Sequence, residues 1–125
     1  MRSIPAGLAG ALIGGAALFC GMAWARAPES GFLKENDAAM ARMMAGMAVK
    51  PTGNVDADFA AMMIPHHQGA IDMAVAELRY GHNEQLRRIA QEIIVDQQQE
   101  IAAMRLALGQ KLPPSAPAPT MAGMK

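Results

Sequence analysis

The stretch Gly81-His82-Asn83 constrains the fold more than any other part of this 125-residue chain. Apolar residues recur at helical spacing from about Asn54 up to this stretch, and again from it to about Gly109. Glycine commonly follows a helix C-terminus, and an asparagine side chain accepts hydrogen bonds from the free N–H groups at a helix start. The pattern therefore predicts two long helices joined by a very short turn, and such helices pack antiparallel.

A further helix is predicted before this hairpin. We expect it to begin between Ser30 and Asn36 and to end before the turn signal Lys50-Pro51-Thr52-Gly53. No alternating strand pattern is present, so we predict an all-α fold, an antiparallel bundle of three to four helices. The apolar stripe of the first helix is expected to contain Leu33, Met40, Met43, Met44 and Met47. The stripe of the last helix is expected to contain Leu86, Ile89, Ile93, Gln97, Glu100, Met104 and Leu108.

The two ends of the chain differ from the helical part. Residues 1–25 combine Arg2, a short apolar run and the small-x-small pattern Ala23-Trp24-Ala25, which is typical of a secretory signal peptide. An uncleaved anchor is the alternative. We expect residues 26–112 to form the helical domain, in the periplasm or outside the cell. Residues 113–125 are rich in Pro and Ala and are predicted to be an extended, disordered tail that carries Met121 and Met124.

Composition excludes several kinds of protein. The only cysteine, Cys20, would leave with the signal peptide, so the exported chain has no disulfide to stabilise it. Arg2 would leave as well, which reduces eleven basic residues to ten against eleven acidic ones. Without a basic surplus, we expect no nucleic-acid partner and, after signal cleavage, no membrane partner.

Hairpin geometry predicts which residues of neighbouring helices share a level. A turn near His82 places residue n of the second helix opposite about residue 164 − n of the third, so His66 and His67 face the region 97–100. A turn near residue 52 places n opposite about 105 − n, so that Met40 lies across from His66 and Met43 from Met62.

The stretch MMIPHHQGAIDM, residues 62–73, carries the most distinctive chemistry. Pro65 and Gly69 interrupt a helical pattern around the adjacent histidines His66 and His67. Met62 and Met63 each precede a histidine by four residues, so each pair shares a helix face. Adjacent histidines point about 100° apart, so we expect them to serve neighbouring sites, or one to bind an ion while the other tunes it. Packing alone is the alternative explanation of Pro65.

Methionine is the strongest compositional signal, because ten of the twelve methionines would remain after cleavage. Thioether sulfur is a soft ligand that favours Cu(I) and, by the same softness, Ag(I), whereas zinc prefers Cys, His and carboxylate. We therefore predict a Cu(I) site in which Gln97 or Glu100 orients a histidine through its second ring nitrogen. The predicted metal ligands are Met40, Met43, Met44, Met62, Met63, His66, His67, Met73 and Met104.

Asp58-Phe59 with MMIPHHQGAIDMA, and the later IAQEIIVDQQQEIAAMR, resemble the exported family catalogued as domain of unknown function 305. The resemblance spans about Met40 to Leu108. It implies a ferritin-like helical bundle, and some members of the family are Met- and His-rich periplasmic copper-binding proteins tied to copper resistance. Only three long helices are predicted here, which leaves open a fourth helix or a homodimer that completes the bundle. The matching residues are Met63, Ile64, His66, His67, Ala70, Ile71, Met73, Ala74, Gln97, Glu100, Ile101 and Met104.

Three functions compete. The first is a periplasmic copper-binding protein that sequesters Cu(I) or passes it to a copper exporter or another envelope copper protein, without enzymatic turnover. The second is a non-catalytic helical interaction module of the cell envelope, with an adaptable Met-rich surface. The third is a di-metal oxidase, which requires carboxylates and Glu-x-x-His motifs on several helices; the chain has no such motif.

Overall fold

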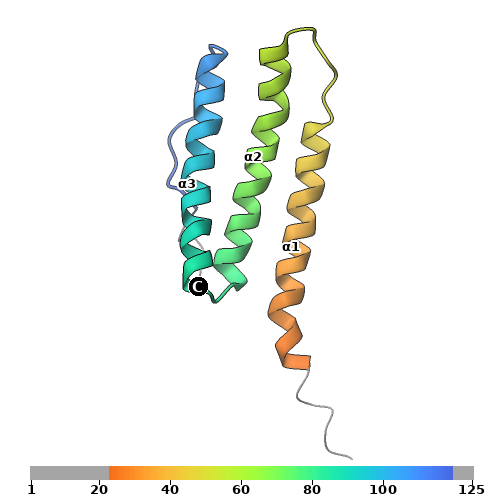
Figure 1. Cartoon of the computed structure of the whole chain (residues 1–125), viewed down its shortest axis with the longest axis vertical. Helices are drawn as coiled ribbons and strands as arrows, with labels where there is room; N and C mark the ends of the chain where they lie inside the picture. Colours follow the sequence, from red (N-terminus) through yellow and green to blue (C-terminus); the bar gives the residue numbers. More distant parts are fainter. Residues whose placement is uncertain (1–22, 120–125) are drawn as a thin grey trace, which may run out of the picture.

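The computed structural model describes residues 23–119, with side chains described from residue 29 onward. Three helices make up this part of the chain: α1 spans Ala23–Met47, α2 spans Val55–Tyr80 and α3 spans Glu84–Ala107 (Figure 1). No strand occurs among the described residues. The predicted all-α helical bundle is therefore confirmed.

Asparagine side chains cap the starts of α2 and α3. The side-chain oxygen of Asn54 accepts a hydrogen bond of 3.1 Å from the N–H of Ala57. Asn83 accepts bonds of 2.9 and 3.1 Å from the N–H groups of Gln85 and Leu86. These caps satisfy backbone donors that have no partner within their helix, and they confirm the predicted starts of both helices.

The other helix ends differ in part from expectation. Gly109 follows α3 in the left-handed conformation, with φ of 69°, whereas Gly81 follows α2 in an extended conformation. The predicted start of the first helix, between Ser30 and Asn36, is wrong because α1 begins at Ala23.

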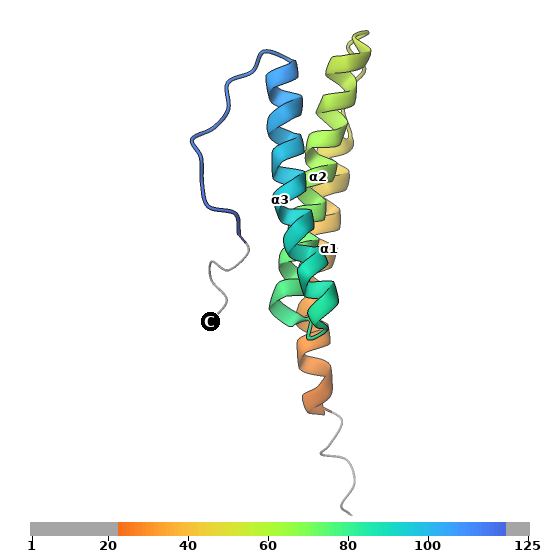
Figure 2. The ribbon, with the colours of Figure 1, turned by 60° about the vertical axis from the view of Figure 1, so that its left-hand side comes forward.

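α2 lies between α1 and α3 in a single layer of helices (Figure 1). Within residues 23–119, α2 packs against both neighbours, whereas α1 and α3 do not contact each other. The segment after α3 returns along one side of this layer (Figure 2). We call this side the tail side. It is lined by Glu35, Ala38, Arg42, Gln68, Asp72, Val75, Arg79 and Gln98, with Pro119 from the returning segment.

The opposite side of the layer is not covered by any described segment, and we call it the open face. On each helix, its residues lie about 180° around the helix axis from those of the tail side. Four of them, Met73, Leu86, Ile89 and Ile93, line one shallow groove between α2 and α3. The open face carries His66 together with the apolar and sulfur-containing residues Leu33, Met40, Met44, Phe59, Met62, Met73, Leu86, Ile89 and Ile93.

Small residues let α1 approach α2 closely. A Cβ atom at Gly46 would lie 2.6 Å from the Cβ of Pro65, and one at Gly69 would lie 2.8 Å from the sulfur of Met43. Neither distance is compatible with a side chain, so both glycines are required by the packing. Pro65 therefore has a packing partner in Gly46, and α2 continues through it without interruption.

The predicted register between α1 and α2 is wrong by about six residues. The contacts between α1 and α2 place residue n of α1 across from about residue 111 − n of α2, because Met43 packs on Gly69 and Gly46 on Pro65. The connection 48–54 is extended, and an extended residue advances about 3.3 Å against about 1.5 Å in a helix. α2 therefore begins well beyond the end of α1 (Figure 1).

The start of α2 is tied to this connection by Thr52. Its backbone N–H lies 3.0 Å from the carboxylate oxygens of Asp58, and its hydroxyl donates to the same carboxylate at 2.6 Å. These bonds favour the ionised form and lower the pKa of Asp58. The extended connection is thus held by specific contacts rather than by a tight turn.

The joint between α2 and α3 forms the core. Ile71, Leu78, Ala90 and Ile94 are each at most 3% exposed and pack in one cluster. The predicted register of this hairpin is confirmed, because a residue of the expected region, Glu100, contacts His67.

The predicted apolar stripes of the outer helices are not the buried ones. In α1 only Met43 of the predicted stripe is buried, together with Ala39. In α3 the buried residues are Ala90 and Ile94, one position beyond the predicted stripe. A flat layer buries only the narrow strip of each outer helix that touches α2, so most of the predicted stripes lie on the open face. The exposed members are Leu33, Met40, Met44, Leu86, Ile89 and Glu100.

The segment after α3 is extended, as the sequence predicts, but it is not independent of the helices. Ala118 packs against the core cluster between α2 and α3, and Pro119 lines the tail side. Met121 and Met124 of the predicted tail lie outside the described residues, as does most of the predicted signal peptide. None of the described helices is both long and apolar enough to span a membrane.

Candidate metal centre

His67 is buried in the joint between α2 and α3, with 8% of its surface exposed. Its Nδ1 lies 2.8 Å from the backbone carbonyl oxygen of Met63, and its Nε2 lies 2.6 Å from a carboxylate oxygen of Glu100. A carbonyl oxygen only accepts, so Nδ1–H donates to Met63, and Nε2 is in hydrogen-bond contact with Glu100. Both ring nitrogens are used inside the protein, so neither is available to an external ligand in this arrangement.

His66 has the opposite environment, although it is the adjacent residue. The helix turns its side chain about 100° away from His67, onto the open face. The ring is exposed and contacts the His67 ring edge-on, with centroids 5.9 Å apart. Within the described part of the chain its ring nitrogens have no hydrogen-bond partner, and the residue is exposed.

Three of the predicted sulfur ligands share the open face with His66. Met62 lies one helical turn before it and is 38% exposed, Met44 is 60% exposed and Met40 is 39% exposed. The observed register places Met44, rather than Met40, near the level of His66. Met62, one helical turn before His66, and Met44, at its level on α1, are therefore the open-face thioethers at this level of the bundle.

The other predicted ligands are less accessible. Met43 is 9% exposed and its sulfur packs against Gly69, so it fills the joint between α1 and α2. The predicted contact of Glu100 with a histidine is present at His67. The Met63 carbonyl was not anticipated as its second partner, although an acceptor one helical turn earlier is a general feature of helices. The half-buried candidates are Met63, Met73, Gln97 and Met104.

The described side chains form no cluster of the kind that usually binds a hard metal ion. Among residues 29–119, no three His, Cys, Asp or Glu side chains come close enough together to hold a metal ion. A di-iron carboxylate centre and a structural zinc site both depend on such a cluster. A metal centre in this part of the molecule would depend on thioether sulfur together with the His66 imidazole.

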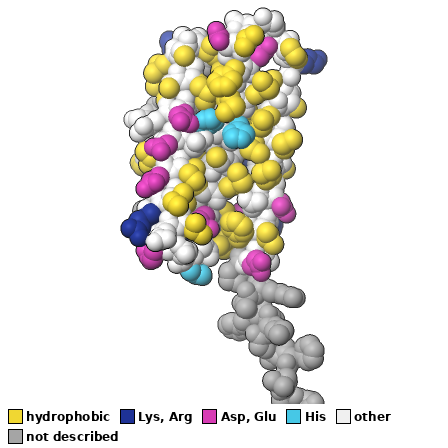
Figure 3. Space-filling model, viewed as in Figure 1, with side chains coloured by type: hydrophobic (Ala, Val, Ile, Leu, Met, Phe, Trp, Pro, Cys, Tyr) yellow, Lys and Arg dark blue, Asp and Glu magenta, His cyan; other side chains and the backbone are white. Residues whose placement is uncertain are grey.

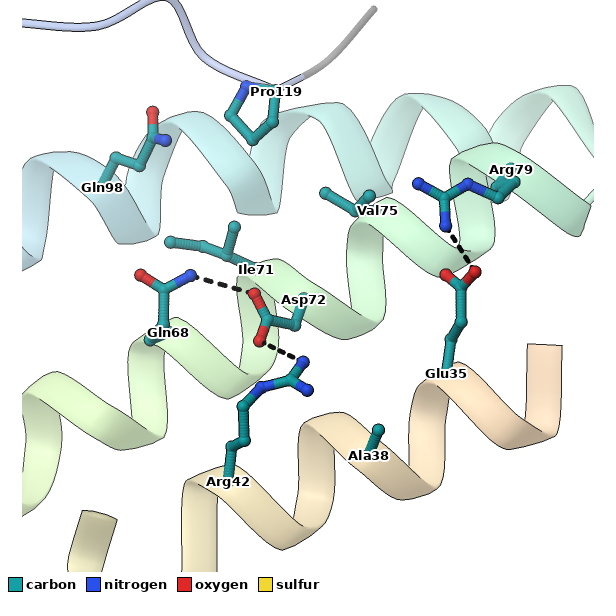
Figure 4. A pocket seen from close by; sticks show the side chains of 10 residues that line it. All are labelled: Glu35, Ala38, Arg42, Gln68, Ile71, Asp72, Val75, Arg79, Gln98 and Pro119. Carbon is teal, nitrogen blue, oxygen red and sulfur yellow. Dashed lines mark hydrogen bonds and ion pairs between the residues drawn. The ribbon is translucent and has the colours of Figure 1, made fainter. Parts of the chain in front are cut away.

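The tail side holds a groove of about 400 Å³, but its charged residues are already paired (Figure 4). Arg42 donates to Asp72 at 2.9 Å, and Gln68 donates to the other carboxylate oxygen of Asp72 at 3.0 Å. Arg79 pairs with Glu35 in the same groove. These contacts join α1 to α2 and leave few free donors or acceptors for a ligand.

The Glu35 carboxylate binds two groups of α2. Arg79 and the hydroxyl of Tyr80, at 2.9 Å, both donate to it. The hydrogen bond from Arg79 is the main cause that lowers the pKa of Glu35, and donation to Glu35 raises the pKa of Tyr80. The cluster thus stabilises the ionised carboxylate and fastens the first half of α1 to the end of α2.

The open face has a different composition. Hydrophobic side chains extend across all three helices, histidine side chains lie among them at mid-height, and Lys and Arg side chains lie at the margins (Figure 3). The groove between α2 and α3 on this side has a volume of about 310 Å³. Asp and Glu side chains are also visible on this side (Figure 3); Glu77 lines the groove, and the exposed Glu100 contacts His67. Exposed apolar and thioether groups therefore gather on this side, whereas paired charges line the tail side.

Comparison with known proteins agrees with the resemblance noted from the sequence. No curated protein matches the chain. A family model matches residues 23–108, which include all three helices and the residues of the His66 region. The chain therefore belongs to the family described as "Domain of unknown function (DUF305)".

Proposed function

We propose that this protein binds Cu(I) in the periplasm or outside the cell and sequesters it or passes it on, without catalytic turnover. The observation that carries this proposal is the placement of a free imidazole, His66, among exposed thioethers on the open face. Thioether and imidazole together suit Cu(I), and also Ag(I), better than they suit hard cations. Copper resistance or homeostasis, with an exporter or another envelope copper protein as recipient, is the role that we infer for this binding.

The different environments of the two histidines support the proposal. The His67 ring is hydrogen-bonded to Met63 and Glu100. These contacts fix the backbone of α2 next to His66. We infer that His66 is the nitrogen ligand, that Met62 and Met44 are sulfur ligands, and that His67 positions the site. Ligands on helices that are fixed in this way lose little freedom when an ion binds.

A competitive Cu(I) titration against a chromogenic chelator under anaerobic conditions tests the proposal. We expect His66→Ala to weaken binding by about tenfold or more, because one ligand is lost. His82→Ala is the matched control, because His82 is an exposed histidine in the turn between α2 and α3. Absence of Cu(I) binding by the unaltered protein would refute the proposal. Equal affinities of the two variants would exclude His66 as a ligand.

The pH dependence of binding separates imidazole from thioether ligands. Protons compete with a metal ion for imidazole but not for thioether sulfur. We therefore expect Cu(I) affinity to fall between pH 7 and pH 5 in the unaltered protein, and to change much less in His66→Ala. An affinity that is flat over this range would show that binding uses methionine alone.

One observation favours the alternative of a non-catalytic interaction module in the envelope. The open face is wider and more apolar than copper binding requires, since Leu33, Phe59, Leu86 and Ile89 are about half exposed. The two functions are compatible, and the Cu(I) titration distinguishes a module that also binds copper from one that does not.

A further inference from the structure

The apolar stripes of the three helices meet on the open face instead of in a core. Leu33, Met40 and Met44 come from α1, Phe59 and Met62 from α2, and Leu86 and Ile89 from α3; each is between 38% and 60% exposed. Amphipathic helices place such stripes against a partner. In the described part of the chain, the stripe of each outer helix contacts α2 only along one edge. No described segment covers the rest of the open face.

The size of the open face matches a stable protein interface. α2 has 26 residues, so the layer is about 39 Å long, and three helices about 9 Å apart are about 25 Å wide. The face therefore covers about 1,000 Å², compared with about 800 Å² per partner in an interface of standard size. A single additional helix would cover only part of it.

Size and symmetry favour a second copy of the same chain as the partner. Lys and Arg side chains lie at the margins of the open face (Figure 3), so basic residues of two copies would not meet at its centre. Acidic side chains on this side include Glu77, which lines the groove, and Glu100, which contacts His67. His66 lies near the middle of α2, the central helix. Any two-fold arrangement that superimposes the two faces therefore brings the two His66 residues close together.

We propose that two copies of this chain pair through their open faces and form a shared Cu(I) site between them. Each copy supplies His66 and neighbouring thioethers from Met44 and Met62, which alone make an incomplete, one-sided set of ligands. The second copy supplies the same donors from the opposite direction. The shared site depends on the proposed copper function, whereas the pairing depends only on the shape and composition of the face.

Sedimentation equilibrium of the purified, metal-free protein tests the pairing. We expect the mass of two chains for the unaltered protein. We expect Ile89→Glu to reduce it to the mass of one chain, because pairing would bury an unpaired carboxylate from each copy in the interface. Val95→Glu is the matched control, since Val95 is an exposed β-branched residue of α3 away from the open face. A single-chain mass for the unaltered protein, or an equal effect of both variants, would overturn the proposal.

A second pair of variants protects the test against loss of folding. Circular dichroism measures the helix content of each variant. If Ile89→Glu unfolds, then Leu86→Glu replaces it, with Leu106→Glu as control; both leucines are exposed on α3, and only Leu86 lies on the open face.

Copper stoichiometry separates failure of the pairing from failure of the copper function. A two-chain species that binds one Cu(I) per pair at the His66 level supports the shared site. A single-chain species that binds Cu(I) would overturn the pairing and leave the copper function intact. A two-chain species that binds no Cu(I) would support the pairing and overturn both the shared site and the copper function.

Discussion

The tail side and the open face are built from the same three helices, yet their chemistry is opposite. On the tail side, Arg42 and Arg79 pair with carboxylates of neighbouring helices, and Ala118 packs back onto the core. On the open face, apolar and sulfur-containing side chains are exposed around His66. The chain pairs the charged groups of one side with its own residues, whereas apolar and thioether groups of the other side stay exposed among the described residues.

The difference also separates the two adjacent histidines. A rotation of about 100° around α2 is sufficient to put His67 into the interior and His66 on the open face. Sequence proximity therefore does not imply a shared role. We expect His67 to contribute mainly to stability and His66 mainly to binding.

The largest effect on stability is expected at the joint between α1 and α2. Gly46→Ala would place a Cβ 2.6 Å from the ring of Pro65, and such overpacking destabilises by about 2 kcal/mol. Urea unfolding followed by circular dichroism measures this change. The control Ala45→Gly, at an exposed neighbouring position, should lose only about 1 kcal/mol, from helix propensity. An increase in stability for Gly46→Ala would show that the joint is looser than described.

A smaller effect is expected from breaking the contacts of His67. His67→Ala leaves the Met63 carbonyl and Glu100 without their partner, and we expect a loss of about 1–2 kcal/mol in the free energy of unfolding. His66→Ala should change it by less than about 0.5 kcal/mol in metal-free protein. Equal losses in the two variants, measured in the same urea series, would contradict the division of roles.

The smallest effect is expected on the tail side, at Glu35. Its pKa is lowered in the folded protein, so its contribution is present above the ordinary carboxyl range and is lost as pH falls through the folded pKa. The partners are partly exposed, which limits the contribution to about 1 kcal/mol or less. We expect Glu35→Gln to reduce stability at pH 7 and to converge with the unaltered protein in acid. A constant difference from pH 7 to pH 3 would contradict this assignment.

The hairpin of α2 and α3 could be predicted from local signals. Asn54 and Asn83 cap the two helices as the sequence suggests, and a turn of three residues leaves little freedom of register. The contact of His67 with Glu100 followed from that register. The connection before α2 offered no such constraint, because extended residues cover more than twice the distance of helical ones. The position of α1 was therefore misjudged by about six residues.

Periodicity alone could not predict which side of each outer helix is buried. A stripe such as Leu86, Ile89 and Ile93 shows that one side of a helix is apolar, but not which surface covers it. The narrow joint with α2 instead uses Ala90 and Ile94, and on α1 it uses Ala39 and Gly residues. The candidate ligands were identified by residue type, and their separation into buried and exposed groups required the observed packing.

The most direct test of the central claim is nuclear magnetic resonance of the protein with ¹³C-labelled methionine methyl groups during titration with Ag(I) or, anaerobically, Cu(I). We predict that the methyl signals of Met44 and Met62 and the ring signals of His66 move together at the first equivalents. The methyl signal of Met43, whose sulfur packs on Gly69, should stay in place. Shifts confined to Met43 and the ring of His67, or no shifts at all, would contradict a soft-metal site on the open face.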